Sequence, residues 1–112
     1  MDTDGLPLRP LEFSILIALA EQERHGYGIV KRIAERSGGG VRLAPGNLYQ
    51  VLDRLVDGGL IEERPAKKRA DGRRRYYGIT AEGRRVAAAE GARLKALVRT
   101  VDRLDLQVDA GP

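Results

Sequence analysis

One stretch of the chain, residues 44–64, constrains the fold more strongly than any other. Its apolar side chains recur three and four positions apart, which is the spacing of one buried helix face. Pro45 suits the first turn of such a helix, where its missing N–H removes no hydrogen bond. Gly58 and Gly59 suit the helix end, where a left-handed residue is needed. The pattern therefore predicts a helix from Pro45 to about Asp57. Its buried stripe consists of Leu48, Val51, Leu52, Leu55 and Val56.

The opposite face of this helix carries Asn47, Gln50 and Arg54. The two amides match the hydrogen-bonding edge of adenine in the major groove, and the arginine matches guanine or a phosphate. The backbone N–H groups of Gly46 and Asn47 have no partner within the helix, which favours binding of a phosphate. Tyr49 fits two interpretations, a hydroxyl donor to a phosphate or a half-buried core aromatic. The helix is therefore a candidate to enter a DNA groove. Its candidate DNA contacts are Pro45, Gly46, Asn47, Tyr49, Gln50 and Arg54.

A pair of strands is predicted to follow the helix. Residues 60–64 and 76–79 have the composition of strands, and an Asp-Gly pair between them favours a turn. An earlier helix, a short connection and the central helix make a helix-turn-helix, so the two strands are predicted to form its wing. Residues 41–43 alternate in polarity and are predicted to pair with the base of the wing.

Positive charge is concentrated in this wing. Residues 1–63 hold seven Lys or Arg against ten Asp or Glu, residues 64–79 seven against one, and residues 80–112 six against five. The excess behind the net charge of +4 therefore lies in the middle segment. Such a patch is expected of a phosphate-backbone binder, although a solvated basic loop has the same composition. Because side chains alternate along a strand, Arg73 and Arg75 or their alternates are expected to face DNA together. The candidate contacts of the wing are Lys67, Lys68, Arg69, Arg73, Arg74 and Arg75.

Two helices are predicted before the central one. The first runs from about Pro10 to Glu23, and the second from about Gly26 to Arg36. His25 is the single histidine of the chain. A metal site or a catalytic triad needs further partners that the pattern does not supply, so His25 is assigned a structural or capping role. The buried face of the first helix is predicted to consist of Leu11, Ile15, Leu16 and Leu19.

A last helix is predicted after Thr80, which suits an N-cap, with Glu82 in the first turn, where the helix dipole favours an anion. Apolar residues then repeat at heptad spacing, which Glu90 interrupts. Few elements remain to cover this stripe, so pairing with a second copy is expected to bury it. Folding back onto the first helix is the alternative. The candidate dimerisation residues are Ala87, Leu94, Leu97, Val101 and Leu104.

Several of these stretches together resemble the PadR family of winged-helix transcriptional regulators. They are residues 11–16, 25–29, 43–49 running into 52–55, and 59–61. The Gly-Asn-Leu-Tyr sequence that ends at Tyr49 is the most specific, and the family more often has a small hydroxyl residue in place of Asn47. The resemblance implies DNA contacts at Tyr49 and its neighbours. It also implies repression in most members, often relieved by a small-molecule effector or a stress signal.

The predicted fold is mainly α-helical with a small β-hairpin. Residues 1–79 are expected to form a winged helix-turn-helix domain, and residues 80–112 a C-terminal dimerisation helix and tail. The expected function is that of a sequence-specific, DNA-binding transcriptional regulator. It would bind double-stranded DNA as a homodimer, read an inverted-repeat operator and act as a repressor in the cytoplasm.

Other classes of function find less support. The chain has no cysteine, which excludes disulfides and thiolate metal sites. No nucleophile–base pair, phosphate-binding glycine loop or metal-ligand cluster is evident, so neither an enzyme nor a cofactor is expected. No apolar run approaches the roughly 20 residues needed to cross a membrane. A protein-interaction module on the same scaffold is the alternative function, which the basic wing disfavours.

Overall fold

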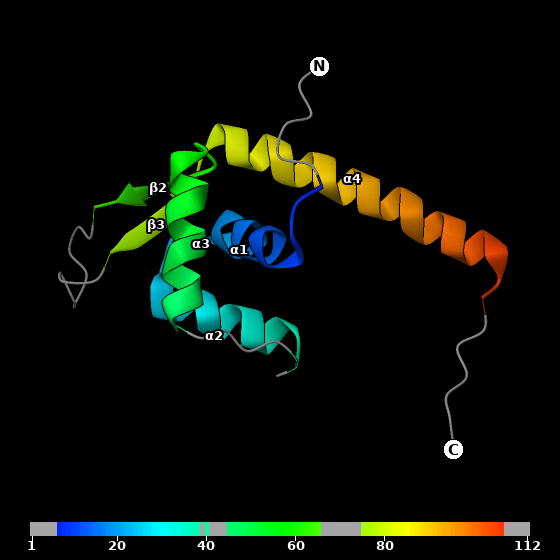
Figure 1. Ribbon diagram of the computed structural model, residues 1–112, viewed down its shortest axis with the longest axis horizontal. Helices are drawn as coiled ribbons and strands as arrows, with labels where there is room; N and C mark the ends of the chain where they lie inside the picture. Colours follow the sequence, from blue (N-terminus) through cyan, green and yellow to red (C-terminus); the bar gives the residue numbers. More distant parts are fainter. Residues whose placement is uncertain (1–6, 39, 41–44, 66–74, 107–112) are drawn as a thin grey trace.

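Figure 1 shows the computed structural model of the chain, which describes residues 7–38, 40, 45–65 and 75–106. The predicted class, mainly helical with a small hairpin, is confirmed. The helices occur at the predicted places, and the sheet gains a strand that was not predicted. The elements are α1 (Pro10–Glu21), β1 (Arg24–His25), α2 (Gly26–Arg36), α3 (Pro45–Asp57), β2 (Ile61–Arg64), β3 (Tyr76–Ile79) and α4 (Ala81–Leu104).

Helix α1 lies in the middle of the molecule, with α2 on one side and α4 on the other (Figure 1). Its residues Ile15, Leu16 and Leu19 are buried as predicted, whereas Leu11 is only partly buried. Phe13, off the predicted stripe, packs against the same core. A helix that is apolar on most sides is expected at the centre of a fold rather than on its surface. The core is therefore built around α1.

The predicted stripe of α3 faces this core. Leu48, Val51, Leu52 and Leu55 are buried, and Val56 packs against them in part. After the helix, Gly59 adopts a φ of 77°, a left-handed conformation that glycine adopts more readily than other residues. The apolar periodicity and the terminating glycine were therefore both interpreted correctly.

The sheet has three antiparallel strands in the order β1-β3-β2. The predicted hairpin is confirmed, with Ile61 opposite Ile79 and Arg64 opposite Tyr76. The third strand was missed: Arg24 and His25 pair with Tyr77 and Tyr76. Two residues are too short to show alternation, so no strand signal could be seen there. The strand predicted at residues 41–43 lies outside the described residues.

Helix α4 begins as predicted, because the Thr80 hydroxyl accepts a hydrogen bond from the Gly83 N–H at 2.9 Å. Gly83 allows the helix to lie directly on the turn before β2. A Cβ at Gly83 would stand 2.0 Å from the carbonyl oxygen of Leu60. This close approach fixes the start of α4 to the hairpin.

The first half of α4 packs inside the chain and the second half does not. Val86 and Glu90 are buried, and Ala87 packs against the core. The Glu90 carboxylate accepts the Leu8 N–H at 3.2 Å, which ties the segment before α1 to α4. Arg93 also donates to it and holds the pKa of Glu90 below its ordinary value. Beyond this point Figure 1 shows α4 extending away from the other helices. The fold-back alternative therefore describes only the beginning of the helix.

Candidate nucleic-acid interface

The exposed face of α3 carries the side chains that were predicted to read DNA. Asn47, Gln50 and Arg54 are all exposed. No ion pair or hydrogen bond joins the Arg54 guanidinium to another of the described residues. A planar guanidinium and two amides on one open helix face can bind base edges or phosphate oxygens without first breaking an internal contact.

Tyr49 stands at the edge of this face with 49% of its surface exposed. Its hydroxyl end lies against the first turn of α2, because a Cβ built on Gly26 would be 2.8 Å from the Tyr49 hydroxyl oxygen. The ring is therefore neither a core aromatic nor a fully solvated one. Gly26 leaves the space in which this hydroxyl sits, which explains why a glycine begins α2.

The first turn of α3 includes Gly46. Gly46 is exposed, and a Cβ built there would meet nothing within 4 Å. Pro45 is the first residue of the helix, as predicted. The free backbone N–H groups of such a start favour an anion.

The wing contributes one described basic residue that is open to a ligand. Arg75 is exposed, with 70% of its side-chain surface accessible, and its guanidinium lies 3.9 Å from the Glu63 carboxylate. That pair is long and solvated, so it costs little to break. The remaining basic residues proposed for the wing lie outside the described residues. They are Lys67, Lys68, Arg69, Arg73 and Arg74.

Arg64 has a different role from the other wing arginines. It forms ion pairs with Glu23 at 2.8 Å and Glu62 at 2.7 Å, and it donates to the Ile79 carbonyl at 3.0 Å. Its guanidinium lies over Gly78, where a Cβ would be 2.5 Å away. These bonds raise the pKa of Arg64 and commit its charge to the base of the hairpin.

His25 performs the capping role that was predicted for it. Its Nδ1 accepts a hydrogen bond from the Gly28 N–H at 3.0 Å, which caps α2. The ring also lies between two tyrosines: its centroid is 6.4 Å from that of Tyr27 in a stacked arrangement, and 5.2 Å from that of Tyr76 edge-on. Sequence reasoning did not find this aromatic row, because its members come from separate elements that only the β1–β3 pairing brings together.

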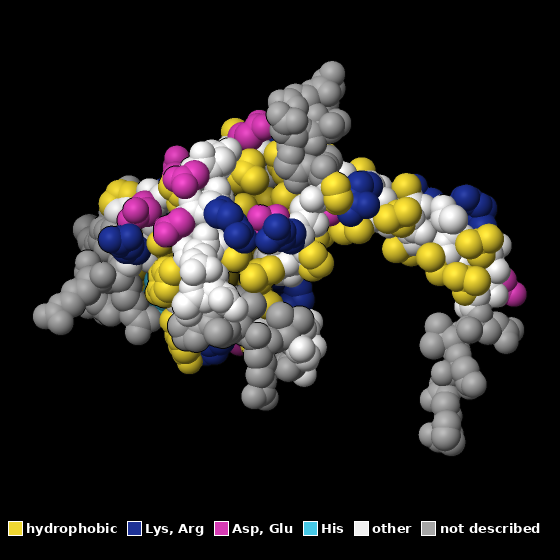
Figure 2. Space-filling model, in the orientation of Figure 1, with side chains coloured by type: hydrophobic (Ala, Val, Ile, Leu, Met, Phe, Trp, Pro, Cys, Tyr) yellow, Lys and Arg dark blue, Asp and Glu magenta, His cyan; other side chains and the backbone are white. Residues whose placement is uncertain are grey.

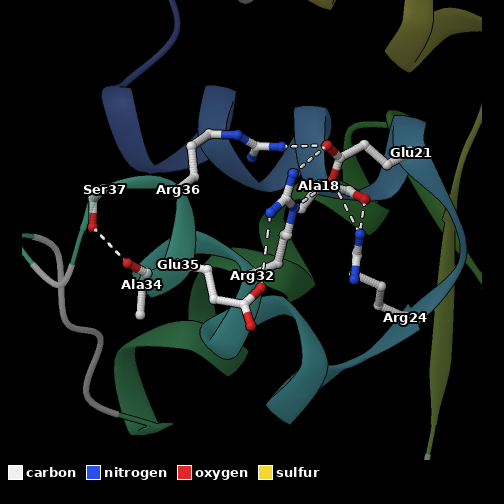
Figure 3. A network of polar contacts seen from close by, with 8 residues as sticks. All are labelled: Ala18, Glu21, Arg24, Arg32, Ala34, Glu35, Arg36 and Ser37. Carbon is white, nitrogen blue, oxygen red and sulfur yellow. Dashed lines mark hydrogen bonds and ion pairs between the residues drawn. The ribbon is translucent and has the colours of Figure 1, made fainter.

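A second group of arginines lies at the junction of α1 and α2 (Figure 3). The Glu21 carboxylate accepts two hydrogen bonds from Arg32, at 2.8 and 2.9 Å, and one each from Arg36 at 2.5 Å and Arg24 at 3.0 Å. The hydrogen bonds from Arg32 are the largest cause of a lowered Glu21 pKa, which falls to about 2. This cluster could not be recognised from the sequence, because its members are spread over two helices and a strand.

The predicted dimerisation residues divide between two environments. Ala87 packs against the core and Leu94 is partly exposed. Leu97, Val101 and Leu104 are 52%, 48% and 61% exposed, and Val98 between them is 57% exposed. Figure 2 shows yellow hydrophobic side chains along this outer half of α4. An apolar row of this length on an extended helix is unusual for a surface that faces only water.

Two further features of the described residues bear on function. Within the described ranges, no group of three or more His, Asp or Glu side chains is arranged so that it could hold a metal ion. No helix among those described has the length and apolar character that a membrane span requires.

Comparison with known proteins shows that the chain is similar to transcriptional regulators. A model of the transcriptional regulator PadR-like family matches residues 15–89. An uncharacterized protein of Lysinibacillus sphaericus is 32% identical over 74 residues, which are 66% of this chain and 68% of that protein.

Solved structures share the fold. A PadR family transcription regulator from Clostridium difficile R20291 is similar with a TM-score of 0.74 at 24% identity, over 84% of this chain and 96% of that one. A PadR-like transcriptional regulator from Bacillus cereus gives a TM-score of 0.74 at 24% identity, over 88% and 93%. RosR of H. salinarum gives a TM-score of 0.63 at 28% identity, over 95% and 86%.

Proposed function

The chain belongs to the PadR-like family of transcriptional regulators, and we propose that it represses transcription by binding an inverted-repeat operator as a homodimer. The membership makes it a DNA-binding regulator of transcription. One observation carries the finer proposal. The same chain exposes a polar helix face suited to base edges and, on a different helix, an apolar row suited to a second copy.

The polar face is that of α3. We assign base reading to Asn47 and Gln50, whose amides can each donate and accept at the edge of an adenine. Arg54 would bind guanine or a nearby phosphate from the next turn of the same face. Arg75 and the other basic residues of the wing would bind the phosphate backbone, which supplies affinity with little sequence discrimination.

The apolar row is that of the outer half of α4. Fully burying one Val or Leu side chain contributes roughly 1.5–3 kcal/mol. Leu97, Val98, Val101 and Leu104 are each about half exposed or more. Four such side chains from each of two copies offset an association cost of several kcal/mol. The exposure pattern therefore supports a symmetric pair of α4 helices.

Pairing through α4 would present two copies of α3 to one duplex. In helix-turn-helix dimers the two reading helices enter the major groove about one DNA turn apart, roughly 34 Å. The two-fold symmetry of the protein then requires an inverted repeat in the DNA. A dimer seated on such a site beside a promoter would exclude polymerase, which is the simplest route to repression and requires no catalysis. This function calls for access to the chromosome, in keeping with the expected cytoplasmic location.

Selection of bound fragments from random and genomic DNA tests the proposal directly. The expected result is a two-fold symmetric motif whose half-sites are centred about 10 base pairs apart. Affinity for the selected duplex should fall steeply with salt, because phosphate contacts release counterions. Failure to bind any duplex at low salt would contradict the proposal and favour the protein-interaction module.

The dimer part has its own test. Leu97→Glu combined with Val101→Glu places charges in the apolar row and is expected to yield single chains in sedimentation. Loss of the second half-site should weaken operator binding by roughly 100-fold or more, because the two contacts then no longer act together. Ala92→Glu, on the opposite exposed side of the same helix, is the matched control and should remain dimeric. Dimers that persist in the double variant would refute the role of α4.

A further inference from the structure

Glu90 is the only charged residue that is buried among those the structure describes, with 2% of its surface exposed. It lies on α4 seven residues before Leu97, at a heptad position of the apolar row where an apolar side chain is expected. Replacing a buried ion pair by apolar residues of similar volume is often neutral or stabilising. A polar residue at a heptad position instead fixes how helices are aligned, at a cost in stability. Glu90 is therefore suited to determine the placement of α4.

The Glu90 carboxylate accepts three hydrogen bonds, of which one comes from a distant segment. Arg93 donates to both carboxylate oxygens, at 2.7 and 2.9 Å, and these two bonds stay within α4. The third donor is the Leu8 N–H at 3.2 Å. Leu8 is buried and lies two residues before Pro10, the first residue of α1. The bond between Leu8 and Glu90 therefore attaches α4 to the beginning of α1.

This bond lies where α4 leaves the rest of the molecule. Near the start of the helix, Gly83 already lies directly against the Leu60 carbonyl. Glu90, seven residues later, is the last buried residue of α4. At 1.5 Å per residue the two places are about 10 Å apart, and the helix continues for roughly 21 Å beyond Glu90 to Leu104. Apolar packing between them has no directional preference, whereas a hydrogen bond does, so the bond at Glu90 fixes the direction of the outer half.

The direction of the outer half determines how far apart two copies hold their α3 helices. Helix α3 and the wing are attached to the first half of α4, and the second copy is attached to the outer half. A tilt of about 10° moves the end of a helical segment roughly 21 Å long by about 4 Å, on the order of the 3.4 Å rise of one base pair. We propose that Glu90, through the Leu8 N–H, is a positioning residue that sets the spacing between the two half-sites. This inference rests on the proposed function, because it specifies which inverted repeats the homodimer accepts.

Glu90→Leu removes the bond from Leu8 and places an apolar side chain at the heptad position. The full-length variant should remain dimeric in sedimentation, because the exposed apolar row is unchanged. Binding is measured on the duplex obtained by selection and on duplexes with one base pair more or fewer between the half-sites. The unmodified protein should prefer the selected spacing by roughly 10-fold or more, because a wrong spacing prevents both half-sites from being engaged together. In Glu90→Leu this preference should fall to about 3-fold or less, while affinity for a single half-site stays unchanged.

Two further variants separate this role from a general effect of charge on α4. Glu90→Gln keeps an oxygen that can accept the Leu8 N–H, and Arg93, which is 38% exposed, can turn toward solvent. This variant should retain most of the spacing preference. Glu82→Leu is the matched control, because Glu82 forms the same pair with Arg85 three residues later but is exposed. It should discriminate between spacings as the unmodified protein does.

The outcomes distinguish this inference from the proposed function. If Glu90→Leu binds as a dimer and keeps the full spacing preference, the positioning role is refuted and the DNA-binding function stands. If Glu90→Gln loses the preference as completely as Glu90→Leu, the Leu8 bond does not set the spacing and the inference is equally wrong. Should Glu90→Leu lose its cooperative melting transition, Glu90→Met, which is flexible and similar in length to glutamate, serves the same comparison. If the unmodified protein forms no dimer or binds no inverted repeat, both the inference and the proposed function fail.

Discussion

Arginine occurs in two regions of this molecule with opposite consequences. At the α1–α2 junction, Arg24, Arg32 and Arg36 converge on the Glu21 carboxylate, with distances of 2.5–3.0 Å (Figure 3). On the α3–wing face, Arg54 has no side-chain partner among the described residues. Arg75 is 70% exposed, with a long ion pair to Glu63 and a contact with the Tyr77 hydroxyl. The residue type is the same in both regions, but the first group is committed to the fold and the second is open to a ligand.

The difference shows that charge predicts a binding surface only when it is left unpaired. A guanidinium already bound to a carboxylate must lose that partner before it can bind a phosphate, and the exchange gains little. The junction therefore contributes fixed geometry between two helices, whereas the α3–wing face contributes affinity. Arg64 lies next to the second region in the chain and yet belongs with the first, because two carboxylates and a carbonyl engage it.

The largest expected effect comes from the arginines of the wing. Arg73→Ala combined with Arg75→Ala should weaken binding to every duplex by roughly 10- to 100-fold per half-site at 0.1 M salt, because each phosphate contact contributes close to one decade there. The slope of log K against log salt should fall by about 1–2 per half-site. Fluorescence anisotropy over a series of salt concentrations measures both quantities.

The matched control removes two arginines from the junction. Arg32→Ala combined with Arg36→Ala lowers the net charge by the same amount, but both side chains are engaged by Glu21. Operator affinity and its salt slope should stay unchanged, while the melting temperature falls. Equal losses of DNA affinity in the two double variants would mean that total charge, and not pairing, determines binding.

A smaller effect is expected at a single base position. Gln50→Ala removes an exposed amide of α3 and should cost about 1–3 kcal/mol of discrimination at one base pair of each half-site. Affinity for unrelated duplexes should change less, because the phosphate contacts remain. Competition between the selected duplex and its single-base variants measures the loss. A uniform loss over all sequences would reassign Gln50 to backbone contact.

Most of the architecture could be predicted from the sequence because it depends on local patterns. The stripe of α3, the left-handed Gly59, the His25 and Thr80 caps and the β2–β3 hairpin all follow from a few consecutive residues. These patterns need no knowledge of what lies across the core.

The features that escaped prediction depend on contacts between distant segments. Strand β1 is two residues long and is defined only by its partner β3. Glu90 was predicted to interrupt the apolar row, but its reason for being there is the Leu8 N–H, 82 positions earlier. Tyr27 drew no attention for the same reason, since its neighbours His25 and Tyr76 come together only in the folded sheet. Pairing of charges across space is likewise invisible to a count of charges along the chain.

A modest effect on DNA affinity is expected from a substitution at Gly26, which lies between the α1–α2 junction and the α3–wing face. Gly26 begins α2, whose last turn carries Arg36 at the junction. In Gly26→Ala the new methyl group would press on the Tyr49 hydroxyl, which is the far end of a side chain that can move. Stability should therefore change by less than about 1–2 kcal/mol. Operator affinity should fall severalfold as the Tyr49 ring is displaced from its place against α2.

Tyr49→Phe supplies the comparison for that variant. It removes the hydroxyl that would meet the new methyl group, so Gly26→Ala made in this background should cost less DNA affinity than in the unmodified protein. Independent, additive losses would show that the two residues do not interact in binding.

The smallest effect is on the stability of the fold at low pH, and DNA binding at neutral pH is not expected to change. The pKa of Glu21 is about 2 in the folded chain, below its ordinary value of 4.5, so its stabilising contribution is present above about 4.5 and is lost as pH falls toward 2. The carboxylate is partly solvated, which keeps the contribution modest. Urea unfolding at pH 7, 4 and 2.5 should therefore show a shallower acid loss for Glu21→Gln than for the unmodified protein. Glu35→Gln, whose carboxylate is 3.8 Å from Arg32 at the rim of the same junction, should retain the full acid loss. If both variants behave alike, the arginines of the junction are not held by Glu21, and the contrast between paired and open arginines loses its basis.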